Sequence, residues 1–176
     1  MTDRPRVSWR EAEPARLEAE RAAMAMHCPD MVWRDDLEWP RGRIGSGWEG
    51  LAPVWDAERA RPAGVEELLG GRRLQLRVLY PEGFPMVPPD LYPLDPDVPI
   101  DRRTQNRWHV NGDGSLCTVQ AAEDWQPDGT AAELVRKASC WFIEYLLVDA
   151  GDLNAMTQRG IYTDDSVDAL LAAKFT

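Results

Sequence analysis

Cysteine is the residue type best suited to covalent chemistry in this sequence, and it occurs at Cys28, Cys117 and Cys140. An odd number of widely spaced cysteines does not form the disulfide framework of a small secreted domain. No Cys-x-x-Cys pair occurs, so a structural zinc site has no support either. The remaining interpretation is that one of these thiols is kept for its reactivity as a nucleophile.

The sequence around each cysteine separates the three thiols. Cys117 follows the turn-forming stretch 112–115 and is followed by Thr118, so an accessible thiol is expected there. No Lys or Arg lies beside it to lower its pKa. Cys140 lies beside aromatic residues and Cys28 at a helix end, and we expect both to be buried as small apolar side chains.

Composition and charge limit the class of protein that carries these thiols. The chain has 176 residues, of which 44% are hydrophobic and 28% charged, which suits one globular domain and excludes a disordered or fibrous chain. The net charge of −10 argues against nucleic acid as a partner. No apolar run approaches the roughly 20 residues of a membrane span, and no signal-peptide core follows Met1. We therefore expect a cytoplasmic protein with no membrane or nucleic-acid partner.

The first half of the chain predicts a helix followed by strands. Ala, Glu and Arg favour the helix, and its face with Arg10, Arg16 and Arg21 is either solvated or a docking surface. Alternating apolar and polar residues predict the strands, with Pro40 ending the first one. The predicted elements are a helix at about 9–27, strands at 31–39, 48–55 and 73–80, a turn at 42–47 and a short helix at 65–69.

The second half predicts an irregular connection and a buried helix. Seven of the fourteen prolines lie between residues 81 and 99, which favours turns and at most a short edge strand at Asp90. Thr130 and Glu133 form a capping box that opens a helix over about 130–148, apolar on nearly all sides. A last helix is predicted at about 165–174. Strands followed by helices indicate an α+β domain: a four-stranded antiparallel meander with an N-terminal helix and a central buried helix.

Several motifs occur in the order found in one enzyme family. They are the prolines and aromatic residue Pro81, Phe84, Pro85, Pro88 and Pro89, the stretch Trp108-His-Val-Asn111, the stretch Gly114-Ser-Leu-Cys117, and Trp125-Gln-Pro127. Over roughly residues 32–152 the chain resembles the ubiquitin-conjugating enzymes. It looks like a divergent bacterial relative, of the kind found in ubiquitin-like conjugation or antiphage operons. Val110 replaces the motif proline, the connection 89–109 is longer than in the eukaryotic enzymes, and 109–117 is shorter.

The resemblance implies a single ubiquitin-conjugating-enzyme-like domain over 1–176, with the sheet at about 31–95 and an active-site segment at about 100–128. It implies that Cys117 accepts a ubiquitin-like protein as a thioester and passes it to an amine of a target. Asn111 is then the candidate oxyanion donor, or only a turn-former. His109 either shapes the loop, as in the family, or acts as a general base. The acid that assists the amine is Asp149, slightly favoured, or Asp124.

The family resemblance also suggests partners. These are a ubiquitin-like modifier whose extended tail ends in Gly, an activating-enzyme-like protein that meets the first helix, and the target. No cofactor or metal is implied. Trp108 and Trp125 either wall the groove for the tail or pack in the core.

Two other functions are compatible with the same residues. One is a non-catalytic module that binds ubiquitin-like proteins, and the other is a thiol hydrolase that pairs Cys117 with His109.

Overall fold

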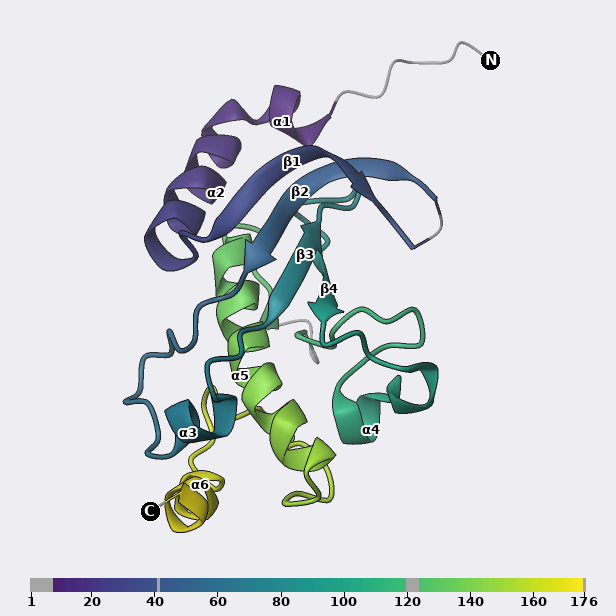
Figure 1. The fold of residues 1–176 in the computed structure, drawn as a ribbon. Helices are drawn as coiled ribbons and strands as arrows, with labels where there is room; N and C mark the ends of the chain where they lie inside the picture. The colour runs from purple at the N-terminus through teal and green to yellow at the C-terminus, as the bar shows by residue number, and fades with distance from the viewer. Residues whose placement is uncertain (1–7, 41, 120–123, 176) are drawn as a thin grey trace.

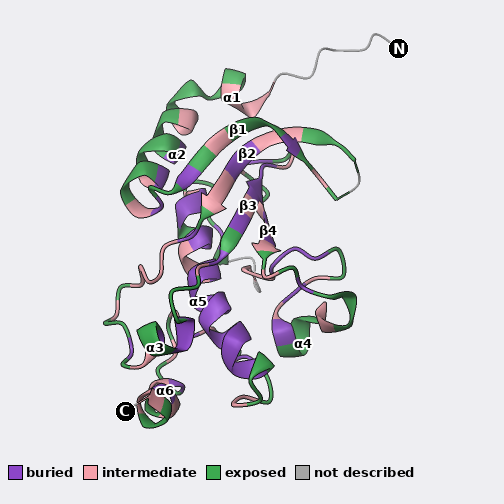
Figure 2. Cartoon of the chain, viewed as in Figure 1, coloured by how far each residue is buried: buried purple, intermediate pink, exposed green. Residues whose placement is uncertain are grey.

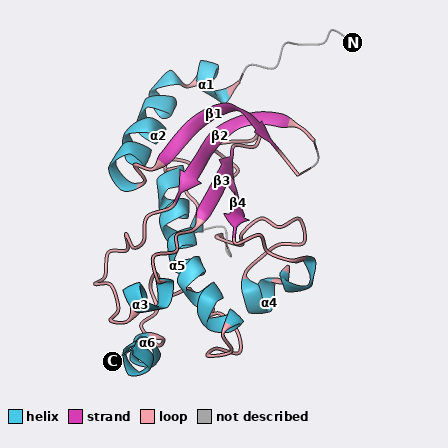
Figure 3. Cartoon of the chain, in the orientation of Figure 1, coloured by secondary structure: helices cyan, strands magenta, loops and turns pink. Residues whose placement is uncertain are grey.

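A computed structural model describes residues 8–40, 42–119 and 124–175 as a mixed α+β structure (Figure 1). Figure 3 separates its helices from its strands. Its helices are α1 Trp9–Ala12, α2 Pro14–His27, α3 Val65–Leu69, α4 Gln105–Trp108, α5 Ala131–Asp149 and α6 Asp168–Phe175, with a short 3-10 helix at Ile100–Arg102. Its strands are β1 Met31–Glu38, β2 Ile44–Leu51, β3 Gln75–Leu79 and β4 Asp90–Asp95. Within the described ranges, no helix has the length and apolar character needed to cross a membrane.

The sheet is the predicted antiparallel meander. Its strands lie in the order β1-β2-β3-β4, so the short strand that begins at Asp90 is an edge strand, as predicted. The prediction for the second strand was wrong, because β2 begins at Ile44 and not at Trp48. The glycines at its start favour a turn in the sequence, yet they lie within the strand. A Cβ on Gly47 would lie 1.8 Å from the carbonyl oxygen of Val78, so glycine there permits close approach of β3.

The predicted N-terminal helix over 9–27 is two helices. Ser8 and Glu11 form a capping box that starts α1, and α2 begins afresh at Pro14. Proline has no N–H to donate and disfavours helical geometry at the residue before it. Glu13 accordingly adopts φ −132° and ψ 67°, outside the helical region. One proline therefore divides a segment whose composition favours a continuous helix.

Helix α5 is the central buried helix that the sequence predicts. The Thr130–Glu133 capping box opens it, and all but four of its nineteen residues are buried. Figure 1 shows it behind the sheet, and Figure 2 shows its nearly continuous burial. Helices α2 and α3 pack on it, and α6 packs on α3. Helix α5 is therefore the central element against which α2, α3 and strand β4 pack.

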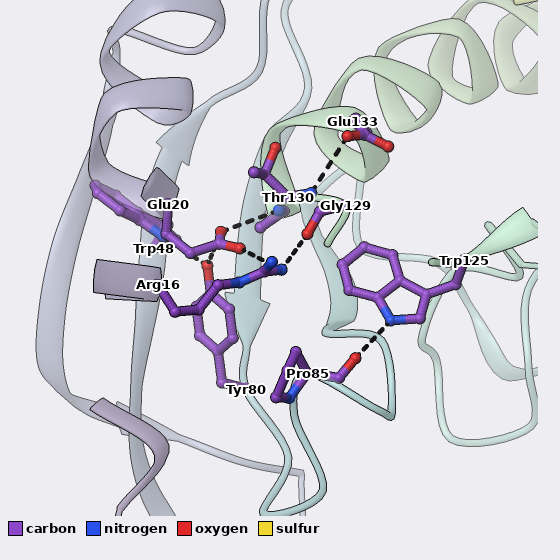
Figure 4. A network of polar contacts seen from close by, with 10 residues as sticks. Arg16, Glu20, Trp48, Tyr80, Pro85, Trp125, Gly129, Thr130 and Glu133 are labelled. Carbon is purple, nitrogen blue, oxygen red and sulfur yellow. Dashed lines mark hydrogen bonds and ion pairs between the residues drawn. The ribbon is translucent and has the colours of Figure 1, made fainter. Parts of the chain in front are cut away.

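Helix α2 carries a buried ion pair in place of a wholly solvated arginine face (Figure 4). Glu20 is fully buried and accepts hydrogen bonds from the Tyr80 hydroxyl at 2.7 Å and the Ala131 amide at 3.0 Å. Arg16 pairs with Glu20 at 3.2 Å and donates to the carbonyl of Gly129. The expectation of a solvated or docking face is therefore wrong for Arg16, which ties α2 to the start of α5.

Candidate active site

Cys117 lies at the end of a tight hairpin at the edge of the sheet. The Cys117 amide donates to the His109 carbonyl at 2.8 Å, and Val110 and Leu116 form an isolated antiparallel bridge. Val110 is fully buried and Leu116 is 5% exposed, so these two side chains anchor the hairpin in the core. The Leu116 amide donates to the carbonyl of Leu91 in β4 at 2.8 Å. The sheet edge thus fixes the backbone on which the thiol sits.

The turn of this hairpin is held by its own polar side chains. Asp113 accepts from the amide of Ser115 at 3.0 Å and from its hydroxyl at 2.7 Å. Asn111 donates to the Ser115 hydroxyl at 3.0 Å and accepts from Gln105 at 2.7 Å. Gly114 has φ 92°, which suits glycine. The Asn111 amide is therefore engaged within the turn, as its interpretation as a turn-former predicts.

A pocket of about 540 Å³ opens beside the thiol. It brings together three of the five predicted site residues, Cys117, His109 and Asp124, and does not include Asn111 or Asp149. Its other lining residues come from α5 and from the segment after it: Lys137, Cys140, Trp141, Glu144, Met156, Thr157, Gln158, Arg159, Gly160, Tyr162 and Thr163, with Leu116 and Thr118 from the hairpin side. No sequence pattern predicted this second wall, which only the fold brings to the thiol.

The three thiols differ in burial, as predicted. Cys28 and Cys140 are each 1% exposed, and burial is the main cause that raises their pKa values to about 12. Cys117 is only partly buried and lies against the pocket. Burial raises the pKa of the Cys117 thiol, and the Asp124 carboxylate raises it further. Cys117 is therefore the most available thiol, but its surroundings hold it in the protonated form.

His109 is bound to the wall of the pocket opposite the hairpin. It adopts the left-handed conformation with φ 49°, at the end of α4. Burial lowers the pKa of His109, and a hydrogen bond to the backbone of Thr157 opposes this shift only in part. The neutral imidazole joins the two walls through Thr157. This is the geometry expected of a residue that shapes the loop.

The two candidate acids occupy different places. Asp149, at the end of α5, pairs with Arg102 at 2.5 Å. Asp124 is exposed, lines the pocket and acts electrostatically on the Cys117 thiol. The slight preference for Asp149, based on its sequence separation from Cys117, is therefore not supported, because tertiary structure brings Asp124 to the thiol.

The two tryptophans that flank the active-site segment belong to the core. Trp108 is 6% exposed and its carbonyl accepts from Trp141 at 2.7 Å. Trp125 is 7% exposed and donates to the Pro85 carbonyl at 2.8 Å (Figure 4). Neither lines the pocket, and both belong to the hydrophobic core, so core packing is confirmed. The bond from Trp125 to Pro85 joins the proline-rich motif to the segment after the cysteine.

Glu144 is a residue of the pocket that was not among the residues predicted from the sequence. It is 1% exposed, accepts from the Thr157 amide at 2.7 Å and hydroxyl at 2.8 Å, and also accepts from the Ile161 amide. Burial raises the pKa of Glu144, while these hydrogen bonds oppose the shift. The available signal was a single glutamate in the apolar run 141–148, where a buried carboxylate needs several donors.

Among the described residues, no group of three or more His, Cys, Asp and Glu is arranged to hold a metal ion.

Comparison of the sequence with family models and with curated proteins found no match. The family resemblance therefore rests on the motifs, their order and the way that the structure joins them.

Proposed function

We propose that the protein has the ubiquitin-conjugating-enzyme fold and carries a ubiquitin-like protein as a thioester on Cys117, for transfer to an amine of a target. The observation that carries the proposal is the placement of Cys117, the least buried of the three thiols, beside a pocket on a hairpin built from the motif residues 109–117. The hydrogen bond between Trp125 and Pro85 adds support, because it joins both halves of the family signature.

The electrostatics of the thiol suit exchange between thioesters. In the charging step, the Cys117 sulfur attacks the carbonyl carbon of an activated thioester, a new C–S bond forms, and the donor sulfur leaves as a thiolate that takes up the proton. One C–S bond replaces another, so the step is nearly isoenergetic. The incoming thioester supplies the activation, and a raised thiol pKa is tolerated because the attacking and leaving sulfurs are alike.

Asp124 is the group best placed to assist discharge to an amine. Its carboxylate lines the same pocket and acts on the Cys117 sulfur. A carboxylate there attracts an incoming ammonium and accepts its proton as the new C–N bond forms and the C–S bond breaks. The same negative charge keeps the resting thiol protonated. Asp124 thus has one role before charging and another after it.

The two alternative functions draw different support from the site. A thiol hydrolase needs a base hydrogen-bonded to the cysteine, yet the Cys117 thiol donates to the Val119 carbonyl at 3.9 Å and the His109 imidazole is bound to the Thr157 backbone. This disfavours hydrolysis. A non-catalytic binding module is compatible with the raised pKa of Cys117, as thioester exchange is. The experiment must therefore separate transfer from simple binding.

The decisive test is a charging assay. The protein is incubated with ATP, an activating enzyme and a ubiquitin-like protein from the same organism, and the products are separated with and without reductant. We expect an adduct that reductant removes and that free lysine discharges. Cys117→Ala abolishes this adduct, whereas Cys117→Ser gives an ester that reductant does not cleave. Cys28 and Cys140 serve as internal controls and stay unmodified.

Two outcomes would overturn the proposal. Binding of the ubiquitin-like protein by both the parent and Cys117→Ala, with no covalent adduct in either, would identify a binding module. Rapid loss of the adduct to water at a rate independent of added amine, and abolished by His109→Ala, would identify a hydrolase.

A further inference from the structure

Lysine is scarce in this chain. It occurs only at Lys137 and Lys174, against eighteen arginines. The guanidinium group of arginine stays protonated and does not attack an acyl group, whereas the ε-amine of lysine does so once it is deprotonated. For an enzyme that carries an activated carboxyl group on its own thiol, the position of each lysine therefore matters.

The two lysines are placed very differently. Lys137 lies on α5, is half-buried and lines the same pocket as Cys117. The Lys137 side chain forms no hydrogen bond or ion pair with the residues that the structure describes, while its neighbour Arg136 is bound to Asp56. Lys174, on α6, pairs with Asp152 and does not line the pocket. One of the two amines thus shares a cavity with the thiol, with no anionic partner among the described residues.

The surrounding structure holds this arrangement in place. Lys137, Cys140 and Glu144 are spaced three and four residues apart on α5, so they share one helix face, and all three line the pocket. Glu144 holds the opposite wall at Thr157 and Ile161 through its three accepted hydrogen bonds. An acyl group on Cys117 would therefore lie at a pocket that Lys137 also lines and whose opposite wall Glu144 holds in place.

We infer that Lys137 is an intramolecular acceptor, so that an acyl group carried on Cys117 is transferred to the Lys137 amine of the same molecule. This inference rests on the proposed function. The neutral nitrogen attacks the thioester carbonyl carbon, the C–N bond forms and the C–S bond breaks. Sulfur leaves with the bonding electrons as a thiolate, and the proton released by nitrogen restores the thiol. The product is an amide that reductant does not cleave.

Intramolecular transfer predicts two kinetic properties. The conversion is first order and does not change when the protein is diluted, because thiol and amine belong to one chain. It also stops after one acyl group, since Lys137 has a single amine and its amide occupies the pocket. Self-modification would thus inactivate a charged enzyme that meets no target.

The test uses the full protein and a defined acyl donor, the thioester of N-acetyl-Gly-Gly with 2-mercaptoethanesulfonate. Excess donor is removed after the pulse, and the acylated residues are located by peptide mass spectrometry with and without reductant. We expect thioester on Cys117 to convert to amide on Lys137, at the same rate over a tenfold range of protein concentration. In Lys137→Arg, which retains the charge, amide formed per thioester falls at least tenfold. Lys174→Arg serves as the matched control and leaves the ratio unchanged.

The outcomes separate this inference from the proposed function. If Cys117 takes up no acyl group from this donor and forms no adduct in the charging assay, the proposed function fails and the inference falls with it; if only the charging assay loads Cys117, the conversion to amide is followed from that adduct. If Cys117 is acylated but the amide is absent, or forms equally in Lys137→Arg, the proposed function stands and the inference is overturned. Amide formation on Lys137 at the same rate in Cys117→Ala also overturns it, because the amine would then react directly with the donor.

Discussion

Among the individual residues, the environment of Cys117 is the feature with the clearest chemical consequence. Burial and the Asp124 carboxylate both raise the pKa of the thiol, and no nearby cation is among the causes. A thiol of this kind reacts slowly with ordinary electrophiles at neutral pH, because only the thiolate is a strong nucleophile. It therefore avoids side reactions until an activated thioester is delivered. The raised pKa also slows the attack of the Cys117 sulfur on the incoming thioester, and docking of the donor beside the thiol must compensate for this.

Removing the Asp124 charge should increase the reactivity of the free Cys117 thiol. In Asp124→Asn the pKa of Cys117 falls, since the anion that disfavours the thiolate is gone. We expect alkylation by iodoacetamide at pH 7.5 to become a few-fold faster, with the midpoint of its pH profile shifted downwards. Asp149→Asn is the control, because Asp149 pairs with Arg102 outside the pocket. Equal rates in the parent and Asp124→Asn would refute this electrostatic role.

At the level of secondary-structure elements, two buried carboxylates connect parts of the chain far apart in sequence. Glu20 joins α2 to Tyr80 and to the start of α5. Glu144 joins α5 to the segment that contains Thr157 and Ile161. In both cases backbone amides donate to the carboxylate, which satisfies groups that would otherwise be buried without partners. These carboxylates position the elements, and the second one also shapes the pocket.

Removing Glu144 should therefore loosen the pocket wall. In Glu144→Ala the amides of Thr157 and Ile161 lose their acceptor, and we expect a loss of about 2–4 kcal/mol in the free energy of unfolding. Glu144→Gln should fall between Ala and the parent, because its amide oxygen still accepts while its NH₂ group faces donors. Hydrogen exchange should rise first at residues 157–161. Exchange that increases uniformly along the chain would contradict a local role.

The Arg16–Glu20 pair predicts non-additive effects. Replacing Glu20 alone by Leu strands the Arg16 guanidinium, whose side chain is only 10% exposed, and should cost about 3 kcal/mol or more. Replacing both residues, as Arg16→Met with Glu20→Leu, removes the unpaired charge and should recover part of that loss. Urea denaturation of the two single variants and the double variant measures the coupling free energy. Additive losses would show that the two charges do not stabilise each other.

For the whole molecule, the raised pKa of one buried carboxyl group links stability to pH. Asp90 in β4 lies near Asp113 in the hairpin turn, and burial together with this second carboxylate raises the pKa of Asp90 from 3.8 to about 6. A carboxyl group whose pKa is raised on folding binds its proton more tightly in the folded state. Its contribution to stability is complete below pH 3.8 and is lost as the pH rises through about 6.

Replacing Asp90 by Asn should therefore stabilise the protein at neutral pH only. At pH 7 we expect a gain of about 1 kcal/mol, reduced from the full electrostatic effect because Asp90 is partly exposed and screened by solvent. Near pH 4 the variant and the parent should differ little. Thermal unfolding at several pH values between 4 and 7 checks this. Equal stabilisation at pH 4 and pH 7 would exclude proton linkage as the cause.

Sequence alone predicted most of the fold because local patterns report burial directly. The alternation around Leu76 and Val78 identified β3, and the Thr130–Glu133 capping box located the start of α5 within one residue. Errors arose where one residue type has two uses. Pro14 restarted a helix, and Gly47 allowed close strand pairing where glycine had been interpreted as a turn.

The residues next to each cysteine also identified Cys117 as the most accessible thiol, because Ser115 and Thr118 are polar whereas the residues after Cys140 are aromatic. Only tertiary structure decided what surrounds that thiol. The chain folds back after α5 and places Thr157 beside His109, and it brings Asp124 and Lys137 to one pocket while Asp149 pairs elsewhere. No local pattern records such contacts, because they depend on how distant segments pack and on which donors reach a buried carboxylate such as Glu144.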